Sequence, residues 1–158
     1  MKTLLGEIKL PPPPDIEFSF SGGRVLIVDD EADIIEYMGI LLREYGFETM
    51  GVTDAVDCVR VAESFRPDVI CLDLVMPKRT GISIYAALRR HRKLGKVPVI
   101  IVSGLTRAGD FAGMSFERIT GDLGISMPEG WIEKPFDKKR FVETVGRTIE
   151  RSGAGSLR

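Results

Sequence analysis

The sequence predicts a doubly wound α/β fold, in which helices cover both faces of a five-stranded parallel sheet. Apolar runs of strand length alternate with helical patterns five times along the chain. The runs at 25–28 and 69–72 contain no polar alternation, which is typical of strands buried on both faces. A chain of 158 residues with 44% hydrophobic composition can bury one core of ordinary size. A single domain is therefore expected.

The first half of this domain contains three predicted strands separated by two helices. Ile34, Met38 and Leu41 recur at helical spacing, and Gly46 stands where a helix C-cap is expected. Thr53 or Asp54 is positioned to cap the second helix. The predicted elements are, in order, a strand at 25–28, a helix at 34–45, a strand at 47–51, a helix at 54–65 and a strand at 69–72.

The second half is less regular. The predicted elements are a helix that begins after Gly81 and ends in the basic run 89–93, strands at 97–102 and 131–133, and a last helix capped by Asp137. Basic residues in a last turn complement the helix dipole, and a nucleic-acid patch is the alternative reading of this run. Between Ser103 and Lys134, several Gly and Pro residues interrupt any long helix. The fourth helix is therefore expected to be short, displaced or preceded by an extra loop.

The two ends of the chain differ from the domain in composition. Residues 1–23 form an N-terminal extension with a Pro-rich linker at 11–14. Apolar and polar residues then alternate at 16–21, which indicates either a short strand that pairs with a sheet edge or a loosely docked tail. Residues 24–150 are expected to form the domain, and residues 151–158 a flexible tail.

Charge and composition restrict the classes of partner. The formal net charge is −1, so no global positive field favours direct binding to nucleic acid or to an anionic membrane. No apolar run reaches membrane-spanning length. Cys58 and Cys71 both fall inside apolar patterns, where reduced, buried thiols in a cytoplasmic protein are expected.

The chemically capable residues stand at the ends of the predicted strands. They are Asp29, Asp30, Asp73, Ser103 and Lys134. Because carboxyl ends of parallel strands meet at one edge of a sheet, these side chains are expected to converge. Three clustered carboxylates repel one another, and an oxygen-only set of this kind suits Mg²⁺. A hydroxyl and an ammonium complete a phosphoryl-binding set, with Asp73 as the nucleophile. The simpler alternative is that Asp73 only caps the turn that follows it.

Four short motifs at these strand ends give the chain a resemblance to the receiver domain of two-component response regulators, over about residues 24 to 150. The motifs are Val28-Asp29-Asp30-Glu31, the run from Asp73 to Gly81 that includes Met76-Pro77, Ile101-Val102-Ser103-Gly104, and Lys134-Pro135-Phe136. The resemblance implies a flavodoxin-like sheet with strand order 2-1-3-4-5. It also implies a phosphoacceptor domain that switches a protein-interaction surface.

The resemblance assigns a role to each residue of the site. Asp73 is expected to accept the phosphoryl group from a histidine kinase or a histidine phosphotransfer protein. Mg²⁺ is expected to bind Asp30, Asp73 and the backbone carbonyl of Val75 directly, and Asp29 through water. Lys134 is expected to contact the phosphoryl oxygens.

The resemblance further implies a switch and an output. Ser103 is expected to move to hydrogen-bond the phosphoryl group, and Trp131 occupies the family's switch-aromatic position. A downstream protein target is implied, and a homodimer is possible. No DNA-binding domain is expected after Arg151, so the chain is interpreted as a stand-alone receiver or as a fragment of a larger protein such as a hybrid kinase.

Two alternatives belong to other functional classes. An aspartyl-phosphate hydrolase requires a second Asp two residues after the nucleophile, and that position is Val75, so no turnover enzyme is expected. A receiver-like module that only binds other proteins would have lost Asp73, one of the acidic pair or Lys134, and all of these are present.

Overall fold

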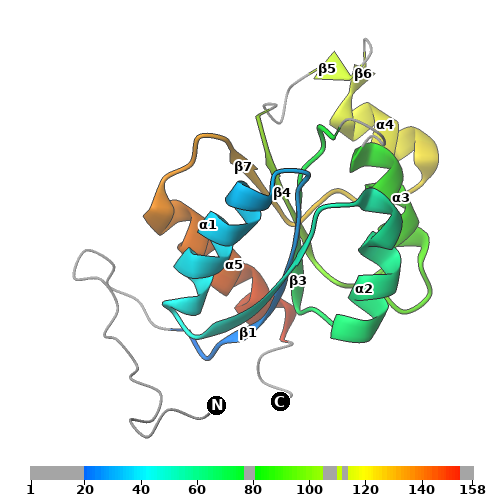
Figure 1. Ribbon diagram of the computed structural model, residues 1–158. Helices are drawn as coiled ribbons and strands as arrows, with labels where there is room; N and C mark the ends of the chain where they lie inside the picture. Colours follow the sequence, from blue (N-terminus) through cyan, green and yellow to red (C-terminus); the bar gives the residue numbers. More distant parts are fainter. Residues whose placement is uncertain (1–19, 77–80, 105–109, 112–113, 154–158) are drawn as a thin grey trace, which may run out of the picture.

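The chain folds into three layers, with a parallel sheet between two layers of helices (Figure 1). The computed structural model describes residues 20–76, 81–104, 110–111 and 114–153. The sheet has five strands in the order β2-β1-β3-β4-β7, all parallel, which confirms the predicted order. The elements are β1 (Gly23–Val28), α1 (Ala32–Arg43), β2 (Phe47–Val52), η1 (Ala55–Asp57), α2 (Cys58–Phe65), β3 (Val69–Leu72), α3 (Gly81–Arg90), β4 (Val99–Ser103), β5 (Asp110–Phe111), β6 (Met114–Ser115), α4 (Phe116–Leu123), β7 (Gly130–Glu133) and α5 (Lys138–Ser152).

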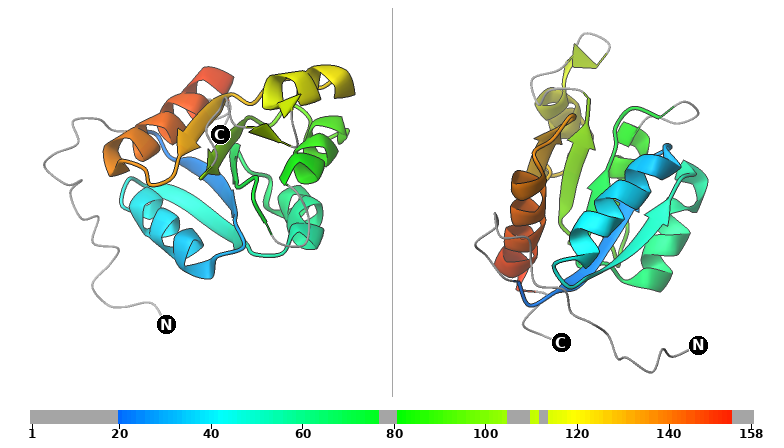
Figure 2. Two further views of the ribbon diagram at one scale, coloured as in Figure 1. Left: turned by 90° about the horizontal axis from the view of Figure 1, so that it is seen from above. Right: turned by 60° about the vertical axis from the view of Figure 1, so that its left-hand side comes forward.

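The two helical layers cover opposite faces of the sheet, as the view from above shows (Figure 2). Helices α1 and α5 lie on one face, and α2, α3 and α4 lie on the other. Successive residues of a strand point to opposite faces. Strand β1 accordingly contributes Val25 and Ile27 to one hydrophobic cluster, and Leu26 and Val28 to the other. The apolar run that predicted a doubly covered strand is thus explained by two separate cores.

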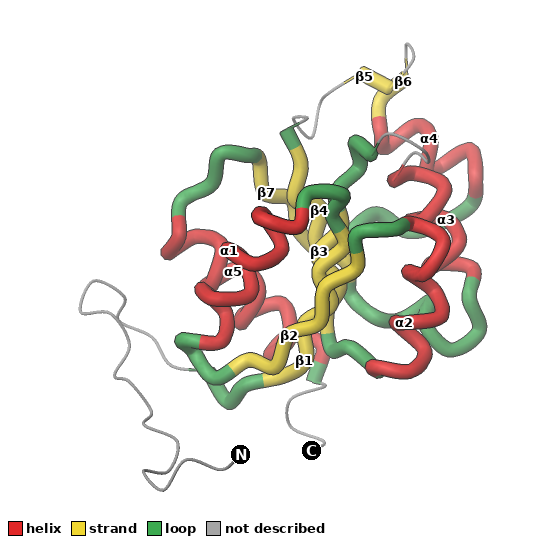
Figure 3. The backbone as a smooth tube through the Cα atoms, in the orientation of Figure 1, coloured by secondary structure: helices red, strands yellow, loops and turns green. Residues whose placement is uncertain are grey.

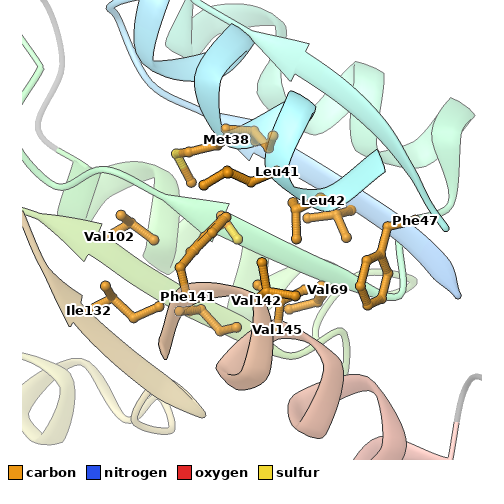
Figure 4. Close-up of a cluster of buried hydrophobic side chains, with 14 of the residues drawn as sticks. Met38, Leu41, Leu42, Phe47, Val69, Val102, Ile132, Phe141, Val142 and Val145 are labelled. Carbon is orange, nitrogen blue, oxygen red and sulfur yellow. The ribbon is translucent and has the colours of Figure 1, made fainter. Parts of the chain in front are cut away.

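The core beneath α1 and α5 is formed by the helical positions that the sequence pattern indicated (Figure 4). Met38 and Leu41 of α1 face Phe141, Val142 and Val145 of α5, and all five are buried. The Asp137 carboxylate caps α5 by accepting a hydrogen bond of 2.9 Å from the Arg140 N–H, as predicted. None of the helices in the described part of the chain is long and apolar enough to cross a membrane.

Several element boundaries differ from the prediction by one to three residues, and two of these differences have a local reason. The second helical segment opens with the 3₁₀ turn η1, where the Asp54 carboxylate accepts a hydrogen bond of 3.0 Å from the Val56 N–H. Strand β4 begins at Val99, two residues later than predicted. Pro98 has no N–H to donate to a ladder, although its carbonyl accepts a hydrogen bond of 3.0 Å from the Ile70 N–H.

The region between β4 and β7 contains the irregularity that the sequence indicated (Figure 3). Strands β5 and β6 form a two-residue antiparallel pair, separate from the main sheet. Helix α4 follows directly and has only eight residues. The Ser115 hydroxyl caps it by accepting a hydrogen bond of 3.2 Å from the Arg118 N–H. The expected short fourth helix with an inserted segment before it is therefore confirmed.

The N-terminal extension reaches the domain at Phe20. This ring is partly buried against the α1–α5 core, and its centroid lies 5.9 Å from that of Phe47. A Cβ atom added at Gly146 of α5 would overlap the Phe20 ring. The glycine therefore makes the room that the aromatic ring occupies. Ile16 and Phe18, which the alternating pattern placed in a possible strand, lie outside the described residues, and Phe20 itself is not in a strand.

The two cysteines are buried in different cores. Cys58 packs among the α2 and α3 side chains, and Cys71 lies on the α1–α5 side. Burial raises the pKa of Cys58 to about 11 and that of Cys71 to about 12. Both are free thiols, and their raised pKa values keep them protonated and unreactive at neutral pH.

The contact between Phe20 and Gly146 gives a test of how the extension is attached. A Gly→Ala change inside a helix normally stabilises it by roughly 1 kcal/mol. Gly146→Ala should instead destabilise this domain, because the new methyl group displaces the Phe20 ring. Phe20→Ala should cost roughly 1–2 kcal/mol of lost burial. In the Phe20→Ala background, Gly146→Ala should become neutral or stabilising, as measured by urea unfolding of all four proteins. Stabilisation by Gly146→Ala in the parent would contradict this packing.

Candidate functional site

The carboxyl ends of four strands bring the predicted polar residues to one edge of the sheet, the upper edge in Figure 1. Asp29 and Asp30 follow β1, Asp73 follows β3, Ser103 ends β4 and Lys134 follows β7. Backbone hydrogen bonds hold these ends in register. The Asp73 N–H donates to the Val28 carbonyl at 2.9 Å, and the Lys134 N–H donates to the Ser103 carbonyl at 2.9 Å. The convergence expected from a parallel sheet is therefore present.

The Lys134 ammonium joins two carboxylates that are almost fully buried. Its Nζ lies 2.6 Å from Asp29 Oδ2 and 3.5 Å from Asp73 Oδ2. Asp29 is 1% exposed and Asp73 is 6% exposed. Burial by itself lowers the pKa of Lys134, but the hydrogen bond with Asp29 and the charges of both carboxylates outweigh burial, so the pKa is raised. Lys134 therefore remains charged and offsets part of the repulsion between the two acids.

The Asp73 carboxylate is held in a defined orientation. Its Oδ1 accepts a hydrogen bond of 3.0 Å from the Val75 N–H, while Oδ2 faces Lys134. Burial raises the pKa of Asp73. The pKa is lowered by the hydrogen bond from the Val75 N–H, by the charge of Lys134 and by a hydrogen bond with Ser103. The charge of Asp29 raises it. The effect of burial is the largest, so the net result is a raised pKa. The Val75 side chain is exposed and contributes only apolar surface beside the carboxylate.

The turn after Asp73 depends on the glycine that ends its sequence motif. The Gly81 N–H donates to the Leu74 carbonyl at 3.0 Å, which starts α3 directly against this turn. A Cβ atom at Gly81 would overlap the backbone of Asp73 and Leu74. Only glycine allows so close an approach. The rest of the motif, residues 77–80, lies outside the described residues.

An acidic group with the chemistry of a cation site adjoins this arrangement. Among the described residues, carboxylate oxygens of Asp29, Asp30 and Glu31 lie within 4.8 Å of one another. Glu31 was not predicted as a ligand, although it directly follows the acidic pair in the sequence. Asp73 is not a member of this group and is linked to Asp29 through Lys134. Oxygen donors of this kind fit Mg²⁺, which prefers carboxylates, carbonyls and water.

Trp131 lies apart from the carboxylates, on the face of the sheet covered by α3 and α4. It pairs with Ile101 in the register of β4 and β7, two positions before the pair formed by Ser103 and Glu133. Its ring is half-buried and meets Phe116 of α4 edge-on, with centroids 5.3 Å apart. The structure therefore connects Trp131 to α4. Along the paired strands, Trp131 lies two residues before the level of Ser103.

Two residues of the basic run at the end of α3 form contacts within the protein. The Arg89 side chain is only 4% exposed and forms an ion pair with Glu129, with 2.8 Å between Nη2 and Oε2. Nδ1 of His91 accepts hydrogen bonds from the Lys93 and Leu94 N–H groups, while Nε2 lies 2.6 Å from Glu63 Oε1. These two residues therefore stabilise the end of the helix, in keeping with the structural reading of the run.

Comparison with known proteins gives matches along most of the chain. The family model described as "Response regulator receiver domain" matches residues 25–146. Protein Rrf1 of Nitratidesulfovibrio vulgaris is 31% identical over 133 residues, which cover 84% of this chain and 87% of Rrf1. The DNA-binding response regulator MtrA of Mycobacterium tuberculosis is 31% identical over 130 residues, but the match covers only 51% of MtrA.

Solved structures show the same architecture. The chemotaxis response regulator CheY4 of Vibrio cholerae superposes with a TM-score of 0.63 at 27% identity, covering 79% of this chain and 97% of CheY4. A receiver domain described as CheY-like from Methanospirillum hungatei gives a TM-score of 0.69 at 18% identity, covering 83% of this chain and 96% of that one. The second likeness concerns the fold alone.

The raised pKa of Asp73 gives a test of the electrostatics of the site. Because the folded protein binds the Asp73 proton more tightly than the unfolded chain does, ionised Asp73 destabilises the fold at neutral pH. Asp73→Asn should therefore raise the Tm at neutral pH in metal-free buffer, by roughly 2–6 °C per kcal/mol relieved. The gain should shrink as the pH falls through the raised pKa and vanish below the ordinary value of 3.8. Asp122→Asn, at an exposed position of α4, is the control. A gain that did not vary with pH would contradict the assignment.

Proposed function

The chain belongs to the response regulator receiver domain family, and from this premise we propose that it is a phosphoacceptor whose acceptor residue is Asp73. The observation that carries the proposal is the buried Asp73 carboxylate at a strand end, with Lys134 Nζ 3.5 Å from Oδ2. The phosphoryl donor is a histidine kinase or a histidine phosphotransfer protein. The acceptor is a signalling module that reacts once per phosphorylation event, and no turnover reaction is assigned to it.

The proposed transfer is an in-line displacement at phosphorus. A carboxylate oxygen of Asp73 forms the new O–P bond, while the P–N bond to the donor imidazole breaks and its electron pair stays with the imidazole nitrogen. The hydrogen bond from the Val75 N–H to Oδ1 orients the carboxylate, which leaves Oδ2 on the Lys134 side. Lys134, already adjacent, neutralises charge on the phosphoryl oxygens.

The acidic residues at this edge supply the proposed Mg²⁺ site. Asp30, Asp73 and the Val75 carbonyl would hold the ion directly, with Asp29 bound through water. Glu31 adds a further oxygen donor in the same group. When bound, the ion would neutralise charge on the phosphoryl oxygens and on the carboxylates that hold it. Receiver domains generally bind Mg²⁺ at an acidic pocket.

Ser103 and Trp131 are the proposed switch residues. Ser103 is fully buried and ends β4 next to Lys134. A phosphoryl group on Asp73 attracts its hydroxyl, and Trp131 then repacks on the α4 side, because packed interiors tolerate few voids. The changed surface would be read by a downstream protein or by a second copy of the chain. MtrA is described as DNA-binding, but this chain spans about half of its length.

Two observations weigh against the other functional classes. An aspartyl-phosphate hydrolase needs a general acid two residues after the nucleophile, and that position holds the exposed apolar side chain of Val75. A module that had abandoned phosphorylation would gain nothing from keeping two carboxylates buried beside a lysine, because such burial is costly.

The primary test is phosphorylation of Asp73. Incubation with acetyl phosphate and Mg²⁺ should add one phosphoryl group per chain, as measured by intact mass spectrometry. Asp73→Ala should remain unmodified, whereas Asp122→Ala, a matched substitution at an exposed position, should be modified to the same extent as the parent. Equal modification of the Asp73→Ala protein would rule out the assignment.

The metal site has a separate thermodynamic test. A cation that binds only the folded state stabilises it by mass action, by roughly 2.7 kcal/mol at one hundred times its Kd. Mg²⁺ should therefore raise the Tm of the parent and of Asp122→Ala. The rise should be lost in Asp30→Ala, because this change removes a proposed direct ligand while leaving the Lys134–Asp29 pair intact. If Asp30→Ala responds as strongly as the parent, the ion binds at another place.

A further inference from the structure

A buried arginine of α3 joins its own helix to two later segments of the chain. Its Nε donates to the Tyr85 hydroxyl at 2.9 Å, Nη1 donates to the Val97 carbonyl at 3.2 Å, and Nη2 donates to the Met127 carbonyl at 2.8 Å. This residue, Arg89, also forms the ion pair with Glu129. All three nitrogens of the guanidinium are therefore used, and none of the bonds involves the proposed phosphorylation site.

Glu129 attaches the start of β7 to β4 in two ways. Its backbone N–H donates to the Val99 carbonyl at 2.9 Å, and its side-chain Oε2 accepts from the Val99 N–H at 2.6 Å. The same oxygen accepts from Arg89. Hydrogen bonds to charged groups are stronger than neutral ones. The first end of β7 is therefore held to both β4 and α3.

The opposite end of β7 is held at the proposed phosphorylation site. The Lys134 N–H donates to the Ser103 carbonyl, and its ammonium contacts Asp29. Strand β7 has four residues and lies at the edge of the sheet, where β4 is its only neighbour among the described strands. Trp131 is the second of these four residues, between the two attachments.

A row of three aromatic rings leads from Trp131 back to the arginine. Trp131 meets Phe116 at 5.3 Å, and Phe116 meets Tyr85 at 5.3 Å between ring centroids. The Tyr85 hydroxyl donates to the Ser126 carbonyl at 2.5 Å and accepts from Arg89. The three aromatic rings and the Arg89–Glu129 ion pair thus form a continuous set of contacts that links α3, α4 and the start of β7.

We propose that Arg89, Glu129 and Tyr85 are positioning residues for the switch, which direct the response to phosphorylation into α4 rather than into a shift of β7. This inference rests on the proposed function of Asp73, Lys134 and Trp131. If the first end of β7 were not attached, the whole strand would shift together with Lys134 when its ammonium turned toward a phosphoryl group. With the first end fixed, the displacement is taken up by the Trp131 side chain and by Phe116, the first residue of α4.

The location of the response follows from this arrangement. Phe116 is fully buried, so a change in its packing moves the start of α4. The end of α4 is linked to α3, because Arg90 Nη2 donates to the Leu123 carbonyl at 3.0 Å. Helices α3 and α4 therefore form the element that responds, and the surface they share is the surface that a partner would read.

Trp131 is the only tryptophan, so its fluorescence reports on the switch without a label. Acrylamide quenching should be compared with and without beryllofluoride, a phosphoryl mimic, in the presence of Mg²⁺. The parent and Arg92→Gln, an exposed control on the same basic run, should show the full change in quenching. Glu129→Gln and Tyr85→Phe should lose more than half of that change. Both substitutions preserve size, and circular dichroism verifies that each variant is folded.

The outcomes separate this inference from the function on which it rests. A full quenching response in both Glu129→Gln and Tyr85→Phe would overturn the positioning role of Arg89, Glu129 and Tyr85, whatever the urea midpoints of the variants, because a purely structural role changes stability alone. Failure of the parent to gain a phosphoryl group from acetyl phosphate would overturn the proposed function itself. A parent that gains the group but shows no change at Trp131 would overturn both the positioning role of the three residues and the switch role of Trp131, while leaving Asp73 as the acceptor.

Discussion

The pairing of one ammonium with two buried carboxylates is the constraint on which the rest of the structure depends. Asp29 and Asp73 are almost completely removed from water, and unpaired burial of either charge would be prohibitive. Lys134 and the backbone N–H groups of Glu31 and Val75 offset this cost. These donors come from segments that follow three different strands. The site can therefore exist only if the register of the parallel sheet is maintained.

The sequence predicted the part of this arrangement that follows from topology. An apolar run without alternation identifies a strand covered on both faces, and parallel strands place their carboxyl ends together. Asp29, Asp73, Ser103 and Lys134 could therefore be assembled from the sequence alone. Glu31 was not predicted as a member of the acidic group, although its carboxylate lies with those of Asp29 and Asp30.

The features that the sequence did not predict depend on distant contacts. Two-residue strands such as β5 and β6 are too short to show a period. An arginine in the last turn of a helix has the same sequence signature whether it is solvated or, like Arg89, bonded to residues about forty positions away. Likewise, a glycine within α5 gives no indication that Phe20 fills the space beside it. In each case the missing information is a tertiary contact, which local patterning does not encode.

The alternation of the sheet residues between two separate cores has a consequence for how the chain tolerates substitution. Strands β1, β3, β4 and β7 each contribute neighbouring residues to clusters that lie on opposite sides of the sheet, so the packing of one side can be altered with little compensation on the other. The inserted β5–β6 segment and the short α4 lie on the side that also holds α2 and α3. Substitutions on the α3–α4 surface, where a signalling partner would bind, are therefore expected to leave the packing of the α1–α5 layer and the acidic edge of the sheet in place.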